Sequence, residues 1–299
     1  MPVSSVREAL RWADSVLKKT PDGSSARDAR LLLASALERD TSWVLAYPEF
    51  ELPSQAWTLF RGWILQRAEG NPIAYLLGRR EFYGRDFVVS PSVLIPRPET
   101  ELLIEQGLKL LECCRTPASH AGRRSDRTGL AVADIGTGSG CIAVTLAAEI
   151  SEAEILATDV SDAALRVARA NAARHGVAGR VRFEQADLLP EGPLLPLLFD
   201  AIFSNPPYGR TNDPDFTEEV RKHEPPAALF GGATGTEVYA RMVPRVVGRL
   251  REGGWLVLEL GYGMADRVRA LFDPALWQDL TVYPDLQQIP RCLVARKNS

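Results

Sequence analysis

The stretch "LAVADIGTGSGCIAVTLA", residues 130–147, decides the fold class of this chain. A short apolar run, typical of a buried strand, passes through a loop with glycines at 136, 138 and 140 into a second apolar run, which we interpret as a helix. Glycines let a backbone take strained turns and lie close to a ligand. In an open α/β sheet, ligands bind where the strands end, so we expect a binding site at this loop.

Strands and helices continue to alternate after this stretch. The predicted strands are "AEILATDV" (153–160), "RVRFEQAD" (180–187), "FDAIFS" (199–204) and "GWLVLELG" (254–261), and helices are predicted at 161–176 and 235–254. The tail, residues 279–298, predicts instead two strands joined by a turn. This order favours a parallel sheet with helices on both faces and an antiparallel edge, which is a Rossmann-like α/β domain.

Residues 1–78 are predicted to form a small helical bundle, because apolar residues recur at helical spacing. One helical face carries Val6, Leu10, Ala13 and Leu17. Residues 79–96 switch to a β-rich sequence, which predicts a β-hairpin. We therefore predict three parts: an N-terminal helical domain that docks the substrate (1–78), the hairpin linker (79–96) and an α/β domain (97–299). The polar, basic tract 113–129 is expected to be a surface loop.

The bulk composition excludes several classes of protein. With 45% hydrophobic and 24% charged residues among 299, the chain is long and apolar enough to bury a core. Its net charge of −3 lacks the positive field of a nucleic-acid-binding protein. It has no apolar run of the roughly 20 residues that span a membrane. The four cysteines show neither a Cys-x-x-Cys spacing nor a histidine partner, so we expect free thiols in a cytoplasmic protein and no metal site.

The glycine loop and the acid after the next strand indicate a nucleoside site, with a plain tight turn and a solvent-exposed acid as the alternatives. The spacing is G-x-G-x-G, whereas dinucleotide-binding loops follow G-x-G-x-x-G, so a diphosphate ligand is disfavoured. Asp159 ends its strand where such domains bind ribose hydroxyls, and Asp187 with Leu188 follows where an adenine ring would lie. S-adenosylmethionine, a nucleoside that carries no diphosphate, would fit such a site. The predicted cofactor residues are Gly136, Thr137, Gly138, Ser139, Gly140, Asp159, Asp187, Leu188 and Asn205.

The strand at 199–204 ends in "NPPY", Asn205–Tyr208, where two prolines in series hold the backbone rigid. Beside a methyl donor, the Asn205 side-chain oxygen and the Pro206 carbonyl would each accept an N–H from a planar amide or amine and aim its nitrogen at the methyl group. Tyr208 would pack flat on the same group. We predict Asn205, Pro206 and Tyr208 as catalytic residues, and Asn205, Pro206, Pro207 and Tyr208 as the substrate-binding residues. A simple strand terminator is the alternative.

Five motifs together carry a resemblance to a known family: "PIAYLLGRREFYG", "LIPRPETELLIE", "DIGTGSGCIAVTLA", "SNPPYG" and "HEPPAALFGG". Over essentially its whole length the chain resembles the protein-(glutamine-N5) methyltransferases of peptide chain release factors, the PrmC/HemK family. The resemblance implies a class I methyltransferase fold, S-adenosylmethionine as cofactor, and methylation of the glutamine in the Gly-Gly-Gln loop of a class 1 release factor. Relatives often carry isoleucine after NPPY, where this chain has Gly209.

Two further groups of residues have two possible roles each. Arg97, Glu99 and Thr100 would either close over the site or only start a helix, and His223 and Glu224 would either line the substrate channel or be structural. We expect a monomer.

Three other functions fit the sequence less well. An N6-adenine or other amino-methyltransferase acting on nucleic acid shares NPPY, but the acidic net charge counts against the positive groove that it needs. A non-catalytic nucleoside-binding protein and a dinucleotide oxidoreductase both leave Asn205–Tyr208 unexplained.

Overall fold

The computed structural model of the chain describes residues 5–17, 25–114, 129–190, 198–211, 213 and 216–298. It divides into two compact units, one of Met1–Arg79 with Thr217–His223 and one of Arg80–Phe216 with Glu224–Ser299. The predicted loop at 113–129 lies almost wholly outside the described residues. The predicted domain boundaries at 78 and 96 stay a prediction.

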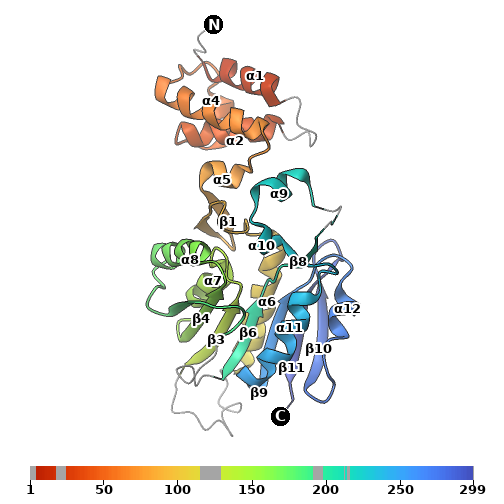
Figure 1. Cartoon of the computed structure of the whole chain (residues 1–299). Helices are drawn as coiled ribbons and strands as arrows, with labels where there is room; N and C mark the ends of the chain where they lie inside the picture. The colour runs from red at the N-terminus through yellow and green to blue at the C-terminus, as the bar shows by residue number, and fades with distance from the viewer. Residues whose placement is uncertain are drawn as a thin grey trace. The chain divides into compact units, whose positions relative to one another are not determined.

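The first unit is helical, as predicted (Figure 1). Its helices are α1 (Val6–Leu17), α2 (Ser25–Ala36), α3 (Thr41–Ala46), α4 (Ser54–Ala68), α5 (Ile73–Leu77) and α9 (Glu218–His223). The sequence reasoning missed α3, a six-residue helix that begins where the Asp40 carboxylate accepts a hydrogen bond from the Trp43 amide at 2.6 Å.

A segment from far along the chain joins this unit. The Arg67 guanidinium bonds Asp28 at 2.8 Å and Glu219 of α9 at 2.9 Å, and the Lys222 ammonium donates to the Glu69 carbonyl. A buried guanidinium needs such partners, because an unpaired buried charge is costly. These ion pairs therefore explain why residues 217–223 pack with the helices of the N-terminal part.

The hairpin predicted at 79–96 is shorter than expected. Strand β1 is Arg79–Phe82 and β2 is Arg85–Val88, and the two form a sheet of their own. Tyr83 and Gly84 between them both have positive φ (51° and 70°). A two-residue turn of this kind matches the twist of the flanking strands.

The second unit is built on a seven-stranded sheet, and this confirms the predicted Rossmann-like α/β fold. Its strands are β3 (Leu130–Ile135), β4 (Ala153–Asp159), β5 (Val181–Gln185), β6 (Phe199–Ser204), β9 (Leu250–Glu259), β10 (Trp277–Pro284) and β11 (Pro290–Lys297). The order is β10-β11-β9-β6-β3-β4-β5. The pairs from β9 to β5 are parallel, and the C-terminal β10 and β11 form the antiparallel edge.

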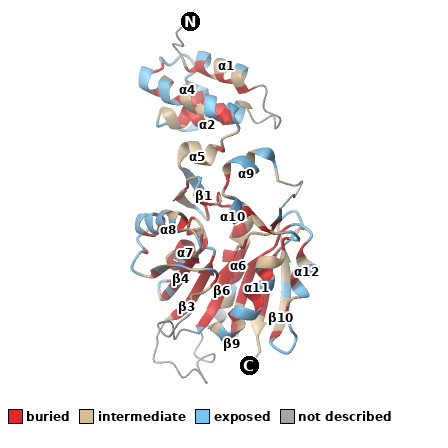
Figure 2. Ribbon diagram, viewed as in Figure 1, coloured by how far each residue is buried: buried red, intermediate tan, exposed pale blue. Residues whose placement is uncertain are grey.

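Helices cover both faces of this sheet, and buried residues concentrate in its central strands (Figure 2). Side chains along a strand alternate between faces. Val132 and Phe203 pack with α6 (Glu101–Cys114), α7 (Cys141–Glu149) and α8 (Asp162–Arg174). Ala133 and Ile202 pack with α11 (Glu237–Val246) and α12 (Ala265–Arg269).

The topology places a crevice between β3 and β6. From β3 the chain runs through β4 and β5 on one side, and it then crosses to β6 and β9 on the other. Ligands bind at such a switch point, outside the carboxyl ends of the strands. The glycine loop follows β3 and NPPY follows β6, so both predicted sites open at this point.

A second small sheet explains Gly209. Strand β7 (Gly209–Arg210) pairs with β8 (Phe230–Gly232), which follows α10 (Pro226–Leu229). A Cβ on Gly209 would overlap the Phe216 ring and the Leu229 carbonyl. This packing leaves no room for a larger residue after NPPY in this chain.

No helix in the described ranges is both long and apolar enough to span a bilayer.

Candidate active site

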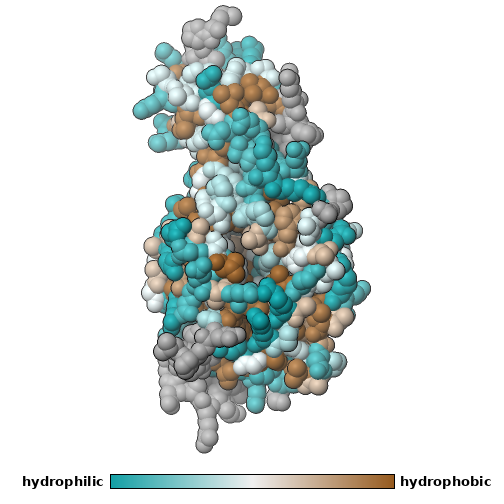
Figure 3. Space-filling model, viewed as in Figure 1, coloured by the Kyte–Doolittle hydropathy of each residue, from teal (hydrophilic) through white to brown (hydrophobic). Residues whose placement is uncertain are grey.

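A cavity of about 330 Å³ lies in the second unit at the carboxyl ends of β3, β4 and β6. Figure 3 shows apolar side chains around a recess in this face of the second unit. The register of the sheet sets the site: Ile135 pairs with both Thr158 and Ser204, so the residues that follow emerge side by side. These are Gly136, Asp159 and Asn205, and all three line the cavity.

The glycine loop has two kinds of glycine. Gly136 (φ 72°) and Gly138 (φ 55°) line the cavity with Thr137 and Ser139, and a Cβ on either glycine would meet no protein atom within 4 Å. Gly140 (φ 82°) does not line the cavity; a Cβ there would lie 3.1 Å from the Ala168 side chain. The first two glycines leave space for a ligand, and the third lets α7 approach α8.

Asp134, in β3, stabilises the glycine loop through hydrogen bonds. Its Oδ2 accepts hydrogen bonds from the Thr137 hydroxyl (2.6 Å) and from the Ala143 amide in the first turn of α7 (3.2 Å). Burial raises the pKa of Asp134 to about 7, and these two hydrogen bonds act in the opposite direction. Asp134 therefore supports the loop and does not line the cavity.

Asp159 is fixed by the backbone on both oxygens. Oδ2 accepts from the Gly138 amide and Oδ1 accepts from the Ser161 amide, each at 2.9 Å. A carboxylate oxygen has two lone pairs, so each oxygen keeps one acceptor site. Asp159 lines the cavity, and this rigid carboxylate is suited to a pair of ligand hydroxyls.

Asp187 and Leu188 line the cavity beyond the end of β5. The Asp187 carboxylate pairs with Arg241 of α11 at 2.6 Å, and Arg241 lines the cavity as well. Leu188 takes positive φ (70°), and its carbonyl accepts from the buried Thr158 hydroxyl at 2.6 Å. Sequence reasoning missed Arg241, which no motif singles out.

The NPPY residues divide between the cavity and the core. Asn205, Pro206 and Pro207 line the cavity, and the Asn205 Nδ2 donates to the Thr100 hydroxyl at 3.2 Å. Tyr208 does not line the cavity; its hydroxyl donates to the Glu259 carboxylate at 3.3 Å. Burial, followed by the nearby Glu259 charge, raises the pKa of Tyr208 above its ordinary range. The predicted stacking of Tyr208 on a substrate stays a prediction.

Thr100 and Glu259 position Asn205 through two successive hydrogen bonds. The Thr100 hydroxyl donates to the Glu259 Oε2 at 2.5 Å, and both residues are about 1% exposed. Burial raises the pKa of Glu259 to about 7, and the hydrogen bonds from Thr100 and Tyr208 lower it in part. The sequence did not point to Glu259, although a lone carboxylate in the apolar strand "WLVLELG" was an available signal.

Arg97 and Glu224 tie two segments of the cavity wall together. The Glu224 carboxylate bonds the Arg97 guanidinium at 2.5 Å and the Ile95 amide at 3.1 Å. Arg97 and Thr100 both line the cavity, whereas Glu99 does not. His223 belongs to the first unit. Arg97 and Thr100, which were expected either to close over the site or only to start a helix, therefore lie at the site. Glu224 holds Arg97 in place there.

Candidate metal sites are absent within the described ranges: no group of three or more His, Cys, Asp or Glu is arranged to hold an ion.

Comparison with known proteins matches both parts of the chain to described families. Residues 8–78 match the PrmC N-terminal domain, and residues 123–222 match the methyltransferase small domain.

Curated relatives cover nearly the full length. The chain is 42% identical over 289 residues to the release factor glutamine methyltransferase of Koribacter versatilis, covering 95% of this chain and 96% of the relative. It is 38% identical over 295 residues to the protein of the same name from Geobacter sulfurreducens, covering 98% and 96%.

Among solved structures, the catalytic domain of hMettl16 in complex with MAT2A 3'UTR hairpin 6 matches with a TM-score of 0.51. The sequences are 20% identical, and the match covers 78% of this chain and 81% of that chain. This likeness shows the fold, and together with the methyltransferase small domain it confirms the predicted class I methyltransferase sheet.

Proposed function

Because the chain belongs to the release factor glutamine methyltransferase family, we propose that it methylates the side-chain amide nitrogen of a glutamine in a peptide chain release factor. The methyl donor is S-adenosylmethionine. The observation that carries the proposal is the position of Asn205, whose side-chain amide lines the cavity beside the glycine loop and is bonded through its nitrogen to Thr100.

The cavity residues fit the cofactor. Gly136 and Gly138 leave open space where any side chain would project, and Asp159 keeps acceptor sites on a carboxylate that two amides hold in place. Asp159 would hold the ribose hydroxyls, and Asp187 with Leu188 would lie against the adenine. When bound, S-adenosylmethionine supplies a methyl group on a positively charged sulfur, which is an electrophile.

The protein's own contribution is to orient the nitrogen that receives the methyl group. An amide nitrogen is a poor nucleophile because its lone pair is delocalised. Two acceptors, the Asn205 Oδ1 and the Pro206 carbonyl, would each take one N–H of the glutamine amide and fix the direction of its nitrogen. Within the part of the chain that the structure describes, the only hydrogen bond of the Asn205 side chain is that of its Nδ2 to Thr100, so Oδ1 remains available.

The substrate within the release factor is the glutamine of the Gly-Gly-Gln loop, and the N-terminal helical unit would dock the factor. We propose that the enzyme acts as a monomer in the cytoplasm, where translation takes place.

Replacing Asn205 tests this function. Asn205→Ala removes one of the two acceptors, so kcat should fall by about 100-fold or more, as when an oriented hydrogen-bonding group is lost elsewhere. S-adenosylhomocysteine binding, measured by calorimetry, should stay within several-fold of wild type, because the glycine loop and Asp159 are unchanged. An Asn205→Ala enzyme that methylates a folded release factor at the wild-type rate would refute the role of Asn205.

A further inference from the structure

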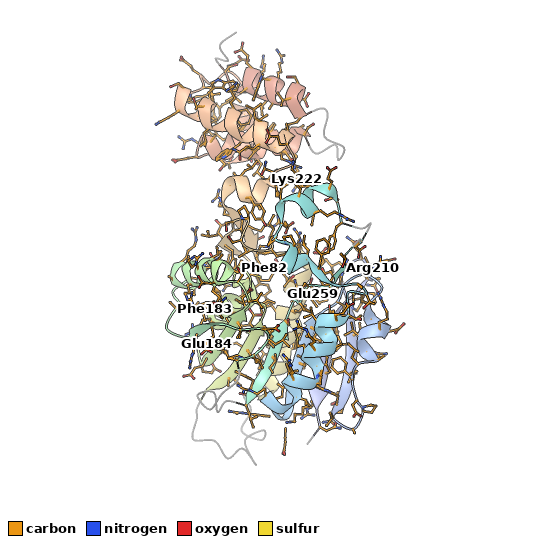
Figure 4. The ribbon with its side chains drawn as sticks, in the orientation of Figure 1. Phe82, Phe183, Glu184, Arg210, Lys222 and Glu259 are labelled. Atoms are coloured by element: carbon orange, nitrogen blue, oxygen red, sulfur yellow. The ribbon has the colours of Figure 1, made fainter. Side chains whose placement is uncertain are left out.

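Glu259 lies at the same level of the sheet edge as Asn205. Strands β6 and β9 pair Ser204 with Leu258, so Asn205 and Glu259 follow side by side. Figure 4 shows Glu259 in the interior of the second unit, close to where β6 ends. Because side chains alternate, Glu259 shares the sheet face of Val257, which packs in the same cluster as α6. Thr100 stands directly before α6, so its hydroxyl reaches the carboxylate.

Glu259, Thr100 and Asn205 are connected by hydrogen bonds. When Glu259 is ionised, only one set of donors and acceptors satisfies these bonds. A carboxylate can only accept, so the single hydroxyl hydrogen of Thr100 is given to Glu259 Oε2. Toward Asn205, the Thr100 oxygen can then only accept. Asn205 must therefore present its Nδ2, and it does so at 3.2 Å. Its Oδ1 is the opposite end of the amide.

We propose that Glu259 is a positioning residue for methyl transfer: through the Thr100 hydroxyl it sets which end of the Asn205 amide is free to accept the N–H of the substrate. This inference rests on the proposed function, because it needs Asn205 Oδ1 as an acceptor. Neither Glu259 nor Tyr208 lines the cavity, so the carboxylate acts on the substrate only through Thr100 and Asn205.

Protonation would reverse the arrangement. A neutral Glu259 can donate to the Thr100 oxygen, which frees the hydroxyl hydrogen for Asn205 Oδ1 and turns Nδ2 toward the substrate. Other titratable groups interact with this site. They are Glu99 in the turn before α6, Cys141 of α7, Tyr208 after β6, Tyr239 of α11, and Arg291 and Cys292 of β11. Among them the acidic Glu99 raises the pKa of Glu259 and the cationic Arg291 lowers it, whereas Thr100 and Tyr208 are its hydrogen-bond donors.

Substitutions at Thr100 and Glu259 test the proposal with a folded release factor and tritiated S-adenosylmethionine. Thr100→Val cannot relay the orientation and should lower kcat by about 10- to 100-fold, the cost of misplacing a reacting group. Thr100→Ser keeps both hydrogen bonds and should restore kcat to within about threefold of wild type. Thr145→Val is the matched control, because the Thr145 hydroxyl is buried and bonds no described residue. S-adenosylhomocysteine affinity should be unchanged in all three variants.

The pH profile separates positioning from a structural role. In the wild type, kcat should rise by about tenfold between pH 6 and pH 8, as Glu259 ionises around a pKa of about 7. Glu259→Gln does not titrate, so it should lack this rise whatever its absolute rate, and Thr145→Val should keep it. This comparison also decides the matter if Thr100→Val fails to fold.

Two results would overturn the positioning role: wild-type kcat in folded Thr100→Val, or an unchanged pH rise in Glu259→Gln. If Asn205→Ala is inactive in the same assay, only the role of Glu259 has failed. If Asn205→Ala is fully active, the role of Asn205 on which this inference rests has failed. If the wild-type protein leaves the glutamine of the folded factor unmethylated, the proposed function itself has failed.

Discussion

At the scale of single residues, Asp134 of β3 and Glu259 of β9 are buried carboxyl groups on the two strands that flank β6. Burial raises the pKa of each to about 7. The native state therefore keeps protons that the unfolded chain has already lost. The free energy of unfolding decreases with rising pH wherever the native state binds more protons than the unfolded state. These two residues thus make the second unit less stable at neutral pH than at mildly acidic pH.

Glu259→Gln tests this linkage. The stabilising effect of the proton on Glu259 is complete below the ordinary pKa of 4.5 and is lost as pH rises through about 7. Wild-type stability should fall across this window, with Glu259 contributing up to about 3 kcal/mol at about 1.4 kcal/mol per pKa unit. The variant should show a shallower decrease, because of these two carboxyl groups with a raised pKa only Asp134 remains. Denaturant unfolding between pH 5 and pH 8 measures both slopes, and equal slopes would contradict the burial effect.

Residues that belong to a local motif could be predicted from the sequence, and residues that act through the fold could not. The glycine loop, Asp159 and Asn205 each end a strand, and the sheet register brings them together. Glu259 lies inside an apolar strand, and Arg241 lies on a helix. Their partners, Thr100 and Asp187, are far away in the sequence.

At the scale of elements, helix α6 packs closely against β6 at Gly107. A Cβ on Gly107, in the middle of α6, would overlap the ring of Phe203, which is fully buried in β6. Glycine is unfavourable inside a helix by about 1 kcal/mol relative to alanine. Its presence here is explained by the close approach, which also brings the start of α6, and with it Thr100, next to Asn205.

Gly107→Ala should destabilise the second unit. The gain in helix propensity is about 1 kcal/mol, whereas overpacking a buried ring costs about 1–3 kcal/mol, so the overlap with Phe203 dominates. Gly62→Ala in α4 is the control, because a Cβ there meets nothing within 4 Å. Hydrogen exchange followed by mass spectrometry should show faster exchange in α6 for Gly107→Ala and slower exchange in α4 for Gly62→Ala. Slower exchange in α6 would contradict the packing account.

The alternating elements of the sheet were predictable because each is long and periodic, or is bounded by glycine. The short elements α3, β7 and β8 were not, since β7 and β8 form only by pairing with each other. The hairpin was predicted too long, because the β-rich residues after Val88 leave the strand and go on to line the cavity at Ser92, Val93 and Leu94.

At the scale of the whole molecule, the chain combines a helical unit and a methyltransferase unit. The first unit includes residues 217–223, which the sequence order alone assigns to the second. Sequence could not predict this, because the ion pair of Arg67 with Glu219 joins residues far apart in the chain. The cavity and the two predicted acceptors belong to the second unit alone.

The most direct test of the central claim locates the methyl group. The purified protein is incubated with S-adenosylmethionine and a folded class 1 release factor, and with DNA and RNA in separate reactions. The product is then analysed by peptide mass spectrometry and tritium counting. We predict one added methyl group on the glutamine of the Gly-Gly-Gln loop and no label in nucleic acid. Label in DNA or RNA, with an unmodified Gly-Gly-Gln peptide, would contradict the account.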